Sequence, residues 1–328
     1  MDKIRWGIIG AGNISIKFAT ALSALDDVEI AAVASRDRNR GEKFAEHFHI
    51  KKVYTDYEAL AKDTEIDVVY IGTPHTEHKT NSALCIKNKK AVLCEKPFTV
   101  NLKDSEYLVS LANEHNVFLM EAMWTKFLPT TLTVKQWIQE KLIGDLRYIS
   151  SSFGYHADFD ITSRIYDPNL GGGALLDVGV YPIAYTIDLM GKLPDQVSSS
   201  AYLGKSGIDE MNVIAMCFKE GVMADLSSAI CANTSNEAVL VGEKGKIVVP
   251  NFWNAQKAVA YDDAGNVIAS FHSPFKANGY EYEAAEVNRC LREGKKESDR
   301  LPLKDTLDIM RLMDSMRAEW GLVYPQEQ

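Results

Sequence analysis

The amino-acid sequence predicts an α/β protein of two domains, in which a doubly wound parallel sheet is followed by an α+β domain with a mainly antiparallel sheet. The chain has 328 residues, and one domain typically takes about 150. Up to residue 123, short apolar runs alternate with segments of helical pattern, whereas beyond residue 146 short strands follow one another through tight turns. We therefore expect a first domain over residues 1–123 and a second over residues 124–328.

The apolar runs of the first domain are short, nearly uninterrupted and partly β-branched. Strands that are buried on both faces of a parallel sheet have this composition. The expected strands are Ile4–Gly10, Glu29–Ser35, Val68–Thr73, Ala91–Glu95 and Phe118–Met123. The segments between them are long and periodic enough for crossover helices, which we expect at Asn13–Leu25, Arg38–Phe48, Glu77–Asn88 and Leu102–His115.

The second domain contains a series of candidate strands, most of them joined by short turns rich in Gly, Asp or Asn. Turns of this kind join antiparallel strands. The expected strands are Leu146–Tyr155, Gln196–Leu203, Asn212–Phe218, Val222–Ser228, Glu237–Val241, Lys246–Val249, Ala258–Tyr261 and Val267–Phe271. We expect one helix at Ala174–Met190 and two more near residues 279–293 and 304–320.

Charge and composition argue against several classes of protein. The chain has 45 acidic and 36 basic side chains, a net charge of -9, and no basic patch for nucleic acid or an anionic membrane. No uncharged apolar run approaches the ~18 residues of a membrane span, and the apolar run at the N-terminus is too short for a secretory signal. Five cysteines form no close pair, unlike a disulfide framework or a zinc site. We expect a cytoplasmic protein without bound metal.

The first strand runs directly into the sequence Gly10-Ala11-Gly12-Asn13-Ile14-Ser15. Gly10 can form a tight turn, and Gly12 can let the backbone approach a pyrophosphate. The helix that begins near Asn13 offers free N–H groups to that anion. The small residue Ser15 replaces the third glycine of the usual fingerprint. A structural glycine turn is the alternative, but the strand before it and the helix after it favour a Rossmann-type dinucleotide site formed by Gly10, Ala11, Gly12, Asn13 and Ile14.

The end of the second strand is where NAD enzymes usually place a carboxylate that binds the ribose. This chain has Ser35 and Arg36 there, followed by Arg38 and Arg40. A guanidinium forms two charge-assisted hydrogen bonds with a 2′-phosphate. We therefore predict NADP as the cofactor, bound by Ser35, Arg36 and Arg40. A solvated basic start of a helix is the alternative, and Asp37 leaves the use of NAD open.

Two later strands end in polar sequences, Gly72-Thr73-Pro74-His75-Thr76-Glu77-His78 and Glu95-Lys96-Pro97. Ligands of open α/β sheets bind at this carboxyl edge. Lys96 would then stand beside the nicotinamide, and the other cofactor-binding candidates are Thr73, Pro74, His75, His78 and Glu95. Each stretch alone is also typical of a solvated strand end. The two histidines are three residues apart but have no third ligand for a metal site.

The remaining signal is the run from Gly171 to Pro182, in which three glycines precede the expected helix. Asp177 and Tyr181 are four residues apart and therefore share one face of that helix. A carboxylate and a phenol that project together offer a substrate a hydrogen-bond acceptor and a proton donor. The alternative is a helix start capped by Asp177, with Tyr181 in the core.

Together these motifs resemble the glucose-fructose oxidoreductase, inositol dehydrogenase and rhizopine-catabolism (Gfo/Idh/MocA) family over essentially the whole chain. The resemblance rests on the initial G-x-G, the T-P with its following His78, the E-K-P at 95–97 and the D-x-G-x-Y helix, in this order. The run Glu121–Thr125, Ser35-Arg36 and Tyr181 look most like the dimeric dihydrodiol dehydrogenase branch. Many sugar and inositol dehydrogenases of the family have histidine in place of Tyr181.

The resemblance implies an NAD(P)-dependent oxidoreductase that moves a hydride between nicotinamide and a carbinol or carbonyl carbon of a sugar, polyol or trans-dihydrodiol. It implies that Lys96 is the catalytic lysine, that Tyr181 transfers a proton and that Asp177 orients the substrate. Trp124 and Tyr155 are further substrate-binding candidates, although aromatic residues are more often core than pocket. A non-catalytic NAD(P)-binding regulator remains the alternative, but such a protein could lose Lys96, Asp177 and Tyr181 freely.

The family fold also implies an open-faced C-terminal sheet, which is commonly buried in a homodimer or a higher oligomer. Four strand residues indicate an apolar sheet face without an obvious helix to cover it: Val213, Ala215, Val222 and Ala224. We therefore expect a homo-oligomer that acts on a small-molecule substrate, with no nucleic-acid or membrane partner.

Overall fold

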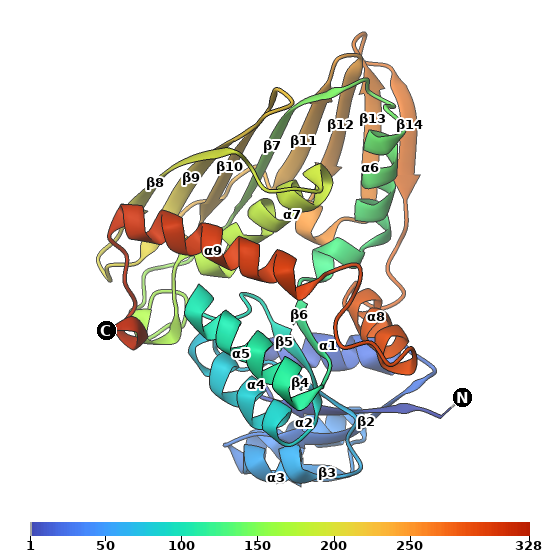
Figure 1. Ribbon diagram of the computed structural model, residues 1–328, viewed down its shortest axis with the longest axis vertical. Helices are drawn as coiled ribbons and strands as arrows, with labels where there is room; N and C mark the ends of the chain where they lie inside the picture. The colour runs from blue at the N-terminus through green and yellow to red at the C-terminus, as the bar shows by residue number, and fades with distance from the viewer. Residues whose placement is uncertain (1) are drawn as a thin grey trace. The chain divides into compact units, whose positions relative to one another are not determined.

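The computed structural model describes residues 2–328 of the chain. These residues form two compact units. The first unit contains the chain up to Trp124 together with Phe275–Met310, and the second contains Thr125–Pro274 together with Arg311–Gln328. Figure 1 shows the two units from residue 2 onward.

The first unit is built on a six-stranded sheet in the order β3-β2-β1-β4-β5-β6 (Figure 1). All recorded pairs of this sheet are parallel. The strands are β1 (Ile4–Ile9), β2 (Val28–Ala34), β3 (Lys52–Tyr54), β4 (Val68–Ile71), β5 (Ala91–Glu95) and β6 (Leu119–Ala122). The strand order reverses between β1 and β4, which is where doubly wound sheets bind ligands. This arrangement confirms the doubly wound parallel sheet predicted from the sequence.

Helices cover both faces of this sheet. The helices α4 and α5 pack together and α3 contacts α4, whereas α1 contacts α2 and α8. They are α1 (Asn13–Ser23), α2 (Arg38–Phe48), α3 (Tyr57–Lys62), α4 (His78–Lys87), α5 (Leu102–His115) and α8 (Glu281–Arg292). The sequence did not indicate β3 or α3, because three strand residues and six helical ones are too few to show a period.

The segment Phe275–Met310 belongs to the first unit by its contacts, whereas we expected it in the second domain. Two side-chain contacts between α8 and the start of the parallel sheet explain this difference. The indole nitrogen of Trp6 donates to Asn288 at 3.2 Å, and Arg292 forms an ion pair with Asp27 at 2.5 Å. The order of elements along the chain does not show that a late segment packs with the first sheet.

The second unit is built on an eight-stranded sheet in the order β14-β13-β12-β11-β7-β10-β9-β8. Its recorded pairs are antiparallel except for β7 with β10, which is parallel. The strands are β7 (Leu146–Gly154), β8 (Gln196–Leu203), β9 (Asp209–Phe218), β10 (Val222–Ala229), β11 (Glu237–Gly242), β12 (Gly245–Pro250), β13 (Lys257–Asp262) and β14 (Val267–His272). A mainly antiparallel second sheet was predicted and is confirmed.

One face of this second sheet packs against helices. The helix α7 (Val180–Met190) lies against β7 and β10, and α6 (Pro129–Gln139) lies against β13 and β14. A π-helical turn, Leu175–Gly179, precedes α7 without a break. The helix α9 (Leu303–Trp320) spans the division between the two units at residue 310. The sequence pattern did not indicate α6.

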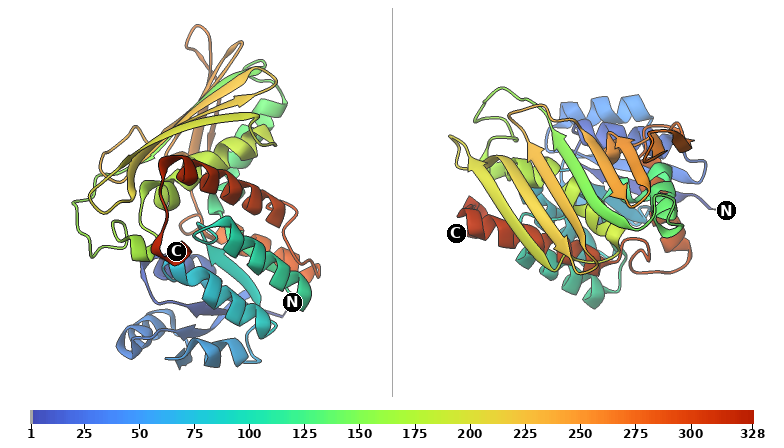
Figure 2. Two further views of the ribbon diagram at one scale, coloured as in Figure 1. Left: turned by 60° about the vertical axis from the view of Figure 1, so that its left-hand side comes forward. Right: turned by 90° about the horizontal axis from the view of Figure 1, so that it is seen from above.

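The other face of this sheet is open in its own unit, and the right-hand view of Figure 2 looks onto the strands of this face. Along β9 and β10, exposed and buried residues alternate. Val213 is 54% exposed and Met223 is 52% exposed, whereas Val222 and Ala224 are buried. Our assignment of Val222 and Ala224 to the open face was therefore wrong, because the register of β10 turns Met223 outward instead.

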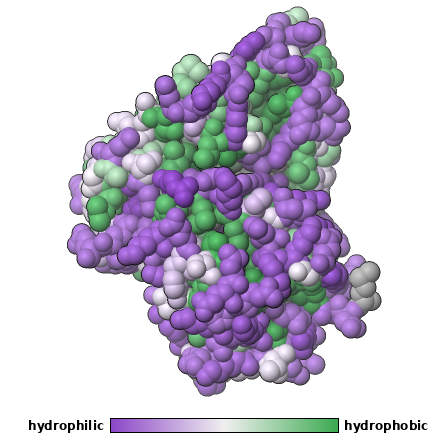
Figure 3. Space-filling view, viewed as in Figure 1, coloured by the Kyte–Doolittle hydropathy of each residue, from purple (hydrophilic) through white to green (hydrophobic). Residues whose placement is uncertain are grey.

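The remaining features agree with a well-packed protein with hydrophilic surfaces. Purple, hydrophilic residues cover most of the face shown in Figure 3, with hydrophobic patches between them. All five cysteines are free. One helical stretch, Pro168–Met190, is long and apolar enough to span a membrane, but 94% of its most apolar window is buried within the protein, as in a core helix.

Candidate active site

The glycine turn after β1 has the geometry of a dinucleotide cradle. Gly10 has φ +97°, and a Cβ there would lie 2.7 Å from the carbonyl oxygen of Gly72, so only glycine fits. A Cβ on Gly12 would meet no atom of the protein within 4 Å, which leaves space above the turn. Helix α1 begins at Asn13 without a side-chain cap, so its first N–H groups are available to an anion. These features fit the pyrophosphate of a dinucleotide.

The segment after β2 presents cations at the surface. Ser35 is buried, whereas Arg36 and Arg40 are exposed, and the structure records no ion pair for either arginine within residues 2–328. Asp37 is the N-cap of α2, where its carboxylate accepts a hydrogen bond from the backbone N–H of Arg40 at 3.1 Å. The carboxylate of Asp37 is therefore committed to its helix. This local geometry fits a 2′-phosphate better than a free ribose hydroxyl.

The strand ends that follow β1, β4 and β5 lie in one row along the carboxyl edge of the first sheet. In the strand register, Ile9 pairs with Ile71 and Ile71 pairs with Cys94. The predicted residues that follow these strands are therefore neighbours at one edge: the Gly10–Ile14 turn, Thr73, Pro74 and His75 after β4, and Glu95 and Lys96 at the end of β5.

Buried hydrogen bonds fix the Glu95-Lys96-Pro97 turn from below. Glu95 accepts from the hydroxyl of Tyr70 at 2.5 Å and from the backbone N–H of Lys96 at 3.2 Å. The ring nitrogens of His78 lie 2.9 Å from the carbonyl oxygens of Pro97 and Thr73. Burial lowers the pKa of His78 to about 4, so the ring is neutral and donates from one nitrogen only. His78 therefore donates to one of these two carbonyl oxygens and lies against the other, between the two loops in which we predicted cofactor contacts.

A cluster of buried carboxyl groups lies behind this turn, and the sequence analysis missed it. Glu121 accepts from the backbone N–H of Phe98 at 3.1 Å and from the hydroxyl of Thr306 at 2.9 Å. Glu283 of α8 is fully buried, and neither of its oxygens has a hydrogen-bond partner within the described part of the chain. Burial, and then the charges of Glu95 and Glu121, raise the pKa of Glu283 well above its usual value. The protonated form of Glu283 is therefore favoured over what an exposed glutamate would show.

In the second unit, Asp177 already has two protein partners. It accepts from the hydroxyl of Tyr155 at 2.6 Å and from the guanidinium of Arg164 at 2.9 Å. Burial, followed by the charge of Asp177, raises the pKa of Tyr155. Tyr155 is therefore a hydrogen-bond donor and not a base. The structure brings the predicted residues Tyr155 and Asp177 together. It also adds Arg164, which no sequence motif marked because it lies in a polar loop.

Aromatic rings surround the predicted tyrosine of α7. Tyr181 is 6% exposed, and its ring centroid lies 5.6 Å from that of Phe153. Phe153 stacks on Trp253 with centroids 3.6 Å apart. In the first unit, the predicted substrate residue Trp124 is buried and stacks on Tyr280 with centroids 4.2 Å apart.

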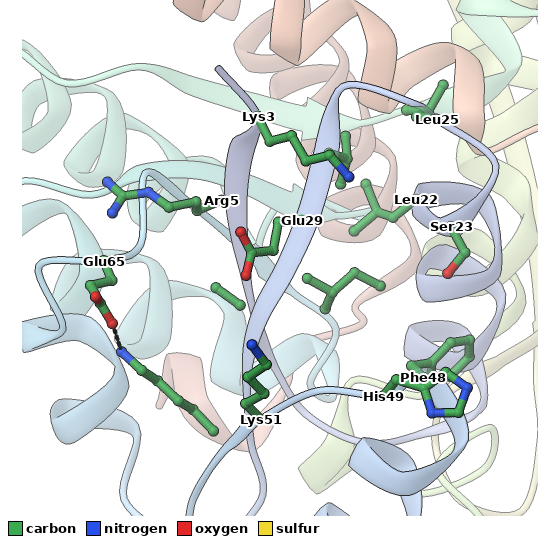
Figure 4. A pocket seen from close by; sticks show the side chains of 14 residues that line it. Lys3, Arg5, Leu22, Ser23, Leu25, Glu29, Phe48, His49, Lys51 and Glu65 are labelled. Atoms are coloured by element: carbon green, nitrogen blue, oxygen red, sulfur yellow. Dashed lines mark hydrogen bonds and ion pairs between the residues drawn. The ribbon is translucent and has the colours of Figure 1, made fainter. Parts of the chain in front are cut away.

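A pocket drawn in Figure 4 lies elsewhere, at the amino ends of β1 and β2. Lys3, Arg5 and Glu29 line it, and Lys52 forms an ion pair with Glu65 across its rim. Because ligands of doubly wound sheets bind at the carboxyl ends of the strands, this pocket is not a candidate for the cofactor.

One group of side chains within residues 2–328 has the spacing to hold a metal ion, namely Glu286, Cys290 and Asp299. The guanidinium of Arg289 forms ion pairs with both Glu286 and Asp299. Arg289 therefore supplies the positive charge beside these carboxylates. His75 and His78 belong to no such group in the described chain.

Known proteins show the same combination of sequence and fold. Residues 4–123 match the family described as "Oxidoreductase family, NAD-binding Rossmann fold", and residues 131–248 match the "GFO/IDH/MocA C-terminal domain". The trans-1,2-dihydrobenzene-1,2-diol dehydrogenase of Danio rerio is 36% identical over 332 residues, which cover 99% of each chain. The protein of the same name from Homo sapiens is 33% identical over 341 residues, again with 99% of each chain covered.

Solved structures agree in fold. A 3-ketoreductase from Actinomadura kijaniata, in complex with NADP and TDP-benzene, is 25% identical with a TM-score of 0.86, covering 97% of this chain and 98% of that chain. An aldose-aldose oxidoreductase from Caulobacter crescentus is 20% identical with a TM-score of 0.87, covering 96% of this chain and 97% of that chain.

These findings define the protein as an oxidoreductase with an NAD(P)-binding Rossmann domain. The chain belongs to the Gfo/Idh/MocA family, as its motifs indicated. The expectation of an NAD(P)-dependent enzyme is confirmed, and the alternative of a non-catalytic regulator finds no support. The individual roles of the predicted site residues stay predictions.

The buried carboxyl group of Glu283 generates a prediction about stability. Its pKa is raised in the folded state, so the folded protein binds a proton that the unfolded chain releases above its ordinary pKa. Stability should therefore fall as the pH rises above the ordinary pKa of a glutamate. We expect Glu283→Gln, which imitates the neutral acid, to reduce this fall by about 1–3 kcal/mol. Urea denaturation at several pH values measures it.

The exposed Glu46 of α2, substituted as Glu46→Gln, is the control and should leave the pH dependence of unfolding unchanged. Parallel pH profiles for wild type and Glu283→Gln would show that Glu283 is ionised in the folded protein, contrary to this account.

Proposed function

We propose that this protein is an NADP-dependent dehydrogenase that interconverts a secondary alcohol and a carbonyl group, with aromatic trans-dihydrodiols as the first substrate class and aldoses or polyols as the second. The observation that carries the proposal is the row of strand ends formed by the Gly10–Gly12 turn, Gly72 and Lys96 at one edge of the sheet. Relatives named trans-1,2-dihydrobenzene-1,2-diol dehydrogenase over the full chain length support the first substrate class.

The preference for NADP rests on the segment after β2. Arg36 and Arg40 are exposed cations, and the carboxylate of Asp37 between them caps its own helix. A 2′-phosphate would gain charge-assisted bonds there, whereas a ribose hydroxyl would find no acceptor comparable to the usual carboxylate.

When bound, the nicotinamide supplies or accepts the hydride. In the direction of reduction, the ammonium group of Lys96 donates a hydrogen bond to the substrate oxygen and stabilises the negative charge that develops on it. The phenol of Tyr181 gives its proton to the same oxygen. Asp177 keeps Tyr155 and Arg164 in place, so we assign it an orienting role through these two side chains.

The substrate is best identified by following nicotinamide absorbance with purified protein, NADP and a panel of trans-dihydrodiols, aldoses and polyols. Turnover of at least one compound is expected. Turnover of none, with NADP binding intact, would contradict the proposed reaction.

We further propose that the protein is a cytoplasmic homodimer or higher homo-oligomer, associated through the open face of its second sheet. The residues that support this surface are apolar and exposed: Tyr148, Tyr202, Met211, Val213 and Met223. Large apolar patches on a protein surface favour association. Free thiols, three of them buried, agree with a reducing compartment.

The first prediction concerns cofactor choice. Arg36→Ala should weaken NADP binding at least tenfold and leave NAD binding within about twofold, because one charge-assisted bond is worth roughly 1.5–3 kcal/mol. Fluorescence titration with both cofactors measures this. Arg38→Ala is the matched control, since Arg38 lies on the same turn and pairs with Glu42. Equal affinity of the wild type for NAD and NADP would refute the preference.

The second prediction concerns proton transfer. Lys96→Met and Tyr181→Phe should each lower kcat about 100-fold or more, with Lys96→Met the more severe because it removes both a charge and a donor. The double variant should be little worse than Lys96→Met, because the two groups act on one step. Tyr185→Phe, one turn along α7, is the control. Near-normal turnover in Tyr181→Phe would remove this tyrosine from the mechanism.

The third prediction concerns assembly. Val213→Glu combined with Met223→Glu should convert the oligomer into a monomer, because two charges on the open face disfavour its burial. Light scattering at low micromolar concentration gives the mass. Val323→Glu, at an exposed position outside the sheet, is the control. A wild-type mass of 36.5 kDa would contradict the proposed association.

A further inference from the structure

A buried carboxylate lies directly beneath the glycine-rich loop of the second unit. Asp209, the first residue of β9, has no exposed surface. Its Oδ2 accepts a hydrogen bond from the backbone N–H of Leu175 at 2.7 Å, at the start of the π-helical turn Leu175–Gly179. Its Oδ1 has no hydrogen-bond partner within residues 2–328. A buried group with half of its hydrogen-bonding capacity unused is costly, which calls for an explanation.

Asp209 begins a chain of buried polar side chains along the sheet. Oδ2 of Asp209 also accepts from the side-chain amide of Asn212 at 2.8 Å, and the Oδ1 atom of Asn212 accepts from the hydroxyl of Ser228 at 2.9 Å. Asn212 and Ser228 are directly paired across β9 and β10. This series of hydrogen-bonded side chains is therefore fixed on two neighbouring strands. At its Asp209 end it binds the backbone N–H of Leu175.

Two glycines let the π-helical turn pack closely against these buried polar side chains. A Cβ on Gly173, which has φ +124°, would lie 2.4 Å from Oδ1 of Asp209. A Cβ on Gly179 would lie 2.8 Å from the hydroxyl of Ser228. The segment Gly173–Gly179, which contains Asp177, thus contacts Asp209 at its first residue and Ser228 at its last. Only glycine fits at these two distances. Single π-helical turns are frequent at functional sites.

The charges around Asp209 come from the C-terminal segment. Arg317 of α9 is the nearby cation, and its guanidinium is held by Glu327 at 2.8 Å and by Asp314 at 2.7 Å. Tyr324 faces Asp209 as well, and its hydroxyl donates to the carbonyl oxygen of Gly172 at 2.6 Å. The groups around Asp209 therefore come from the glycine-rich loop and from the C-terminal segment that binds this loop.

We infer that Asp209 is a positioning residue, whose ionised carboxylate holds the Gly173–Gly179 turn and thereby sets the orientation of Asp177 and Tyr181. The negative charge strengthens the bond to the N–H of Leu175 and favours the amino end of the helix that follows. This role rests on the proposed function of Asp177 and Tyr181, although the anchoring itself can be tested without any substrate.

The anchoring depends on pH in a direction that can be derived. Burial raises the pKa of Asp209 to about 7, and hydrogen bonds from Asn212 and Leu175 oppose that shift. As the pH rises through 7 the carboxylate ionises, so the turn becomes better held and kcat increases. Stability changes in the opposite sense: the folded protein binds a proton that the unfolded chain lacks, so stability falls between pH 4 and pH 7. A residue that only stabilised the fold would not give opposite trends.

The test compares the wild type with Asp209→Asn, which has the shape of the neutral acid. At pH 8 we expect kcat to fall at least fivefold with KM within twofold, and stability to be equal or higher. The part of the pH profile of kcat near 7 should vanish. Asp195→Asn is the matched control, because Asp195 also accepts a backbone N–H, from Lys219 at 2.8 Å, at the opposite end of β9. A kcat within twofold of the wild type at pH 8 would overturn the inference.

Hydrogen exchange of the peptide 171–181 gives a second measurement, which needs neither substrate nor a variant that folds. In the wild type, protection of the Leu175 amide relative to its intrinsic rate should increase at least fivefold between pH 6 and pH 8. Constant protection would overturn the anchoring. If no substrate is turned over but this protection changes as expected, the proposed function fails while the role of Asp209 in holding the turn stands.

Discussion

The first unit depends on one close approach between two strand ends. Gly10 and the carbonyl oxygen of Gly72 are so near that a single methyl group on Gly10 would lie 2.7 Å from that oxygen. This contact lets the turn after β1 pass over the end of β4, and it places the uncapped start of α1 above the carboxyl edge of the sheet. Gly72 is constrained in the same way, because a Cβ on Gly72 would lie 2.4 Å from the hydroxyl of Ser15. The anion site is thus a consequence of backbone packing.

Most of the fold follows from local sequence, because buried parallel strands and antiparallel hairpins each have a distinct pattern of apolar residues. The expected strand Gln196–Leu203 agrees with β8 at both ends, and β13 agrees with expectation to within one residue at each end. Patterns fail where an element is short or where its partner is distant. The helix α8 has an ordinary amphipathic sequence, and only its bonds to Trp6 and Asp27 show which sheet it joins.

The candidate site shows the same division. The motifs identified Lys96, Asp177 and Tyr181 because glycines, prolines and strand ends surround them. No motif marked Arg164, Asp209 or Glu283, since each owes its importance to residues far away in sequence or to burial. Along β10 we assigned Val222 to the open face, whereas the structure buries Val222 and exposes Met223. Sequence patterns therefore located the groups of the proposed chemistry and missed the residues that hold them.

The two buried acids differ in what their surroundings offer. Glu283 has no hydrogen-bond donor in the described chain and faces two other carboxyl groups, so nothing opposes the rise of its pKa on burial. Asp209 is equally buried, but a backbone N–H, an amide and the charge of Arg317 oppose the effect of burial and bring its pKa to about 7. The same desolvation penalty thus raises the pKa of Glu283 without opposition in one unit, whereas in the other it leaves Asp209 with a pKa of about 7. Donors, and not depth of burial, decide which acid can respond to pH.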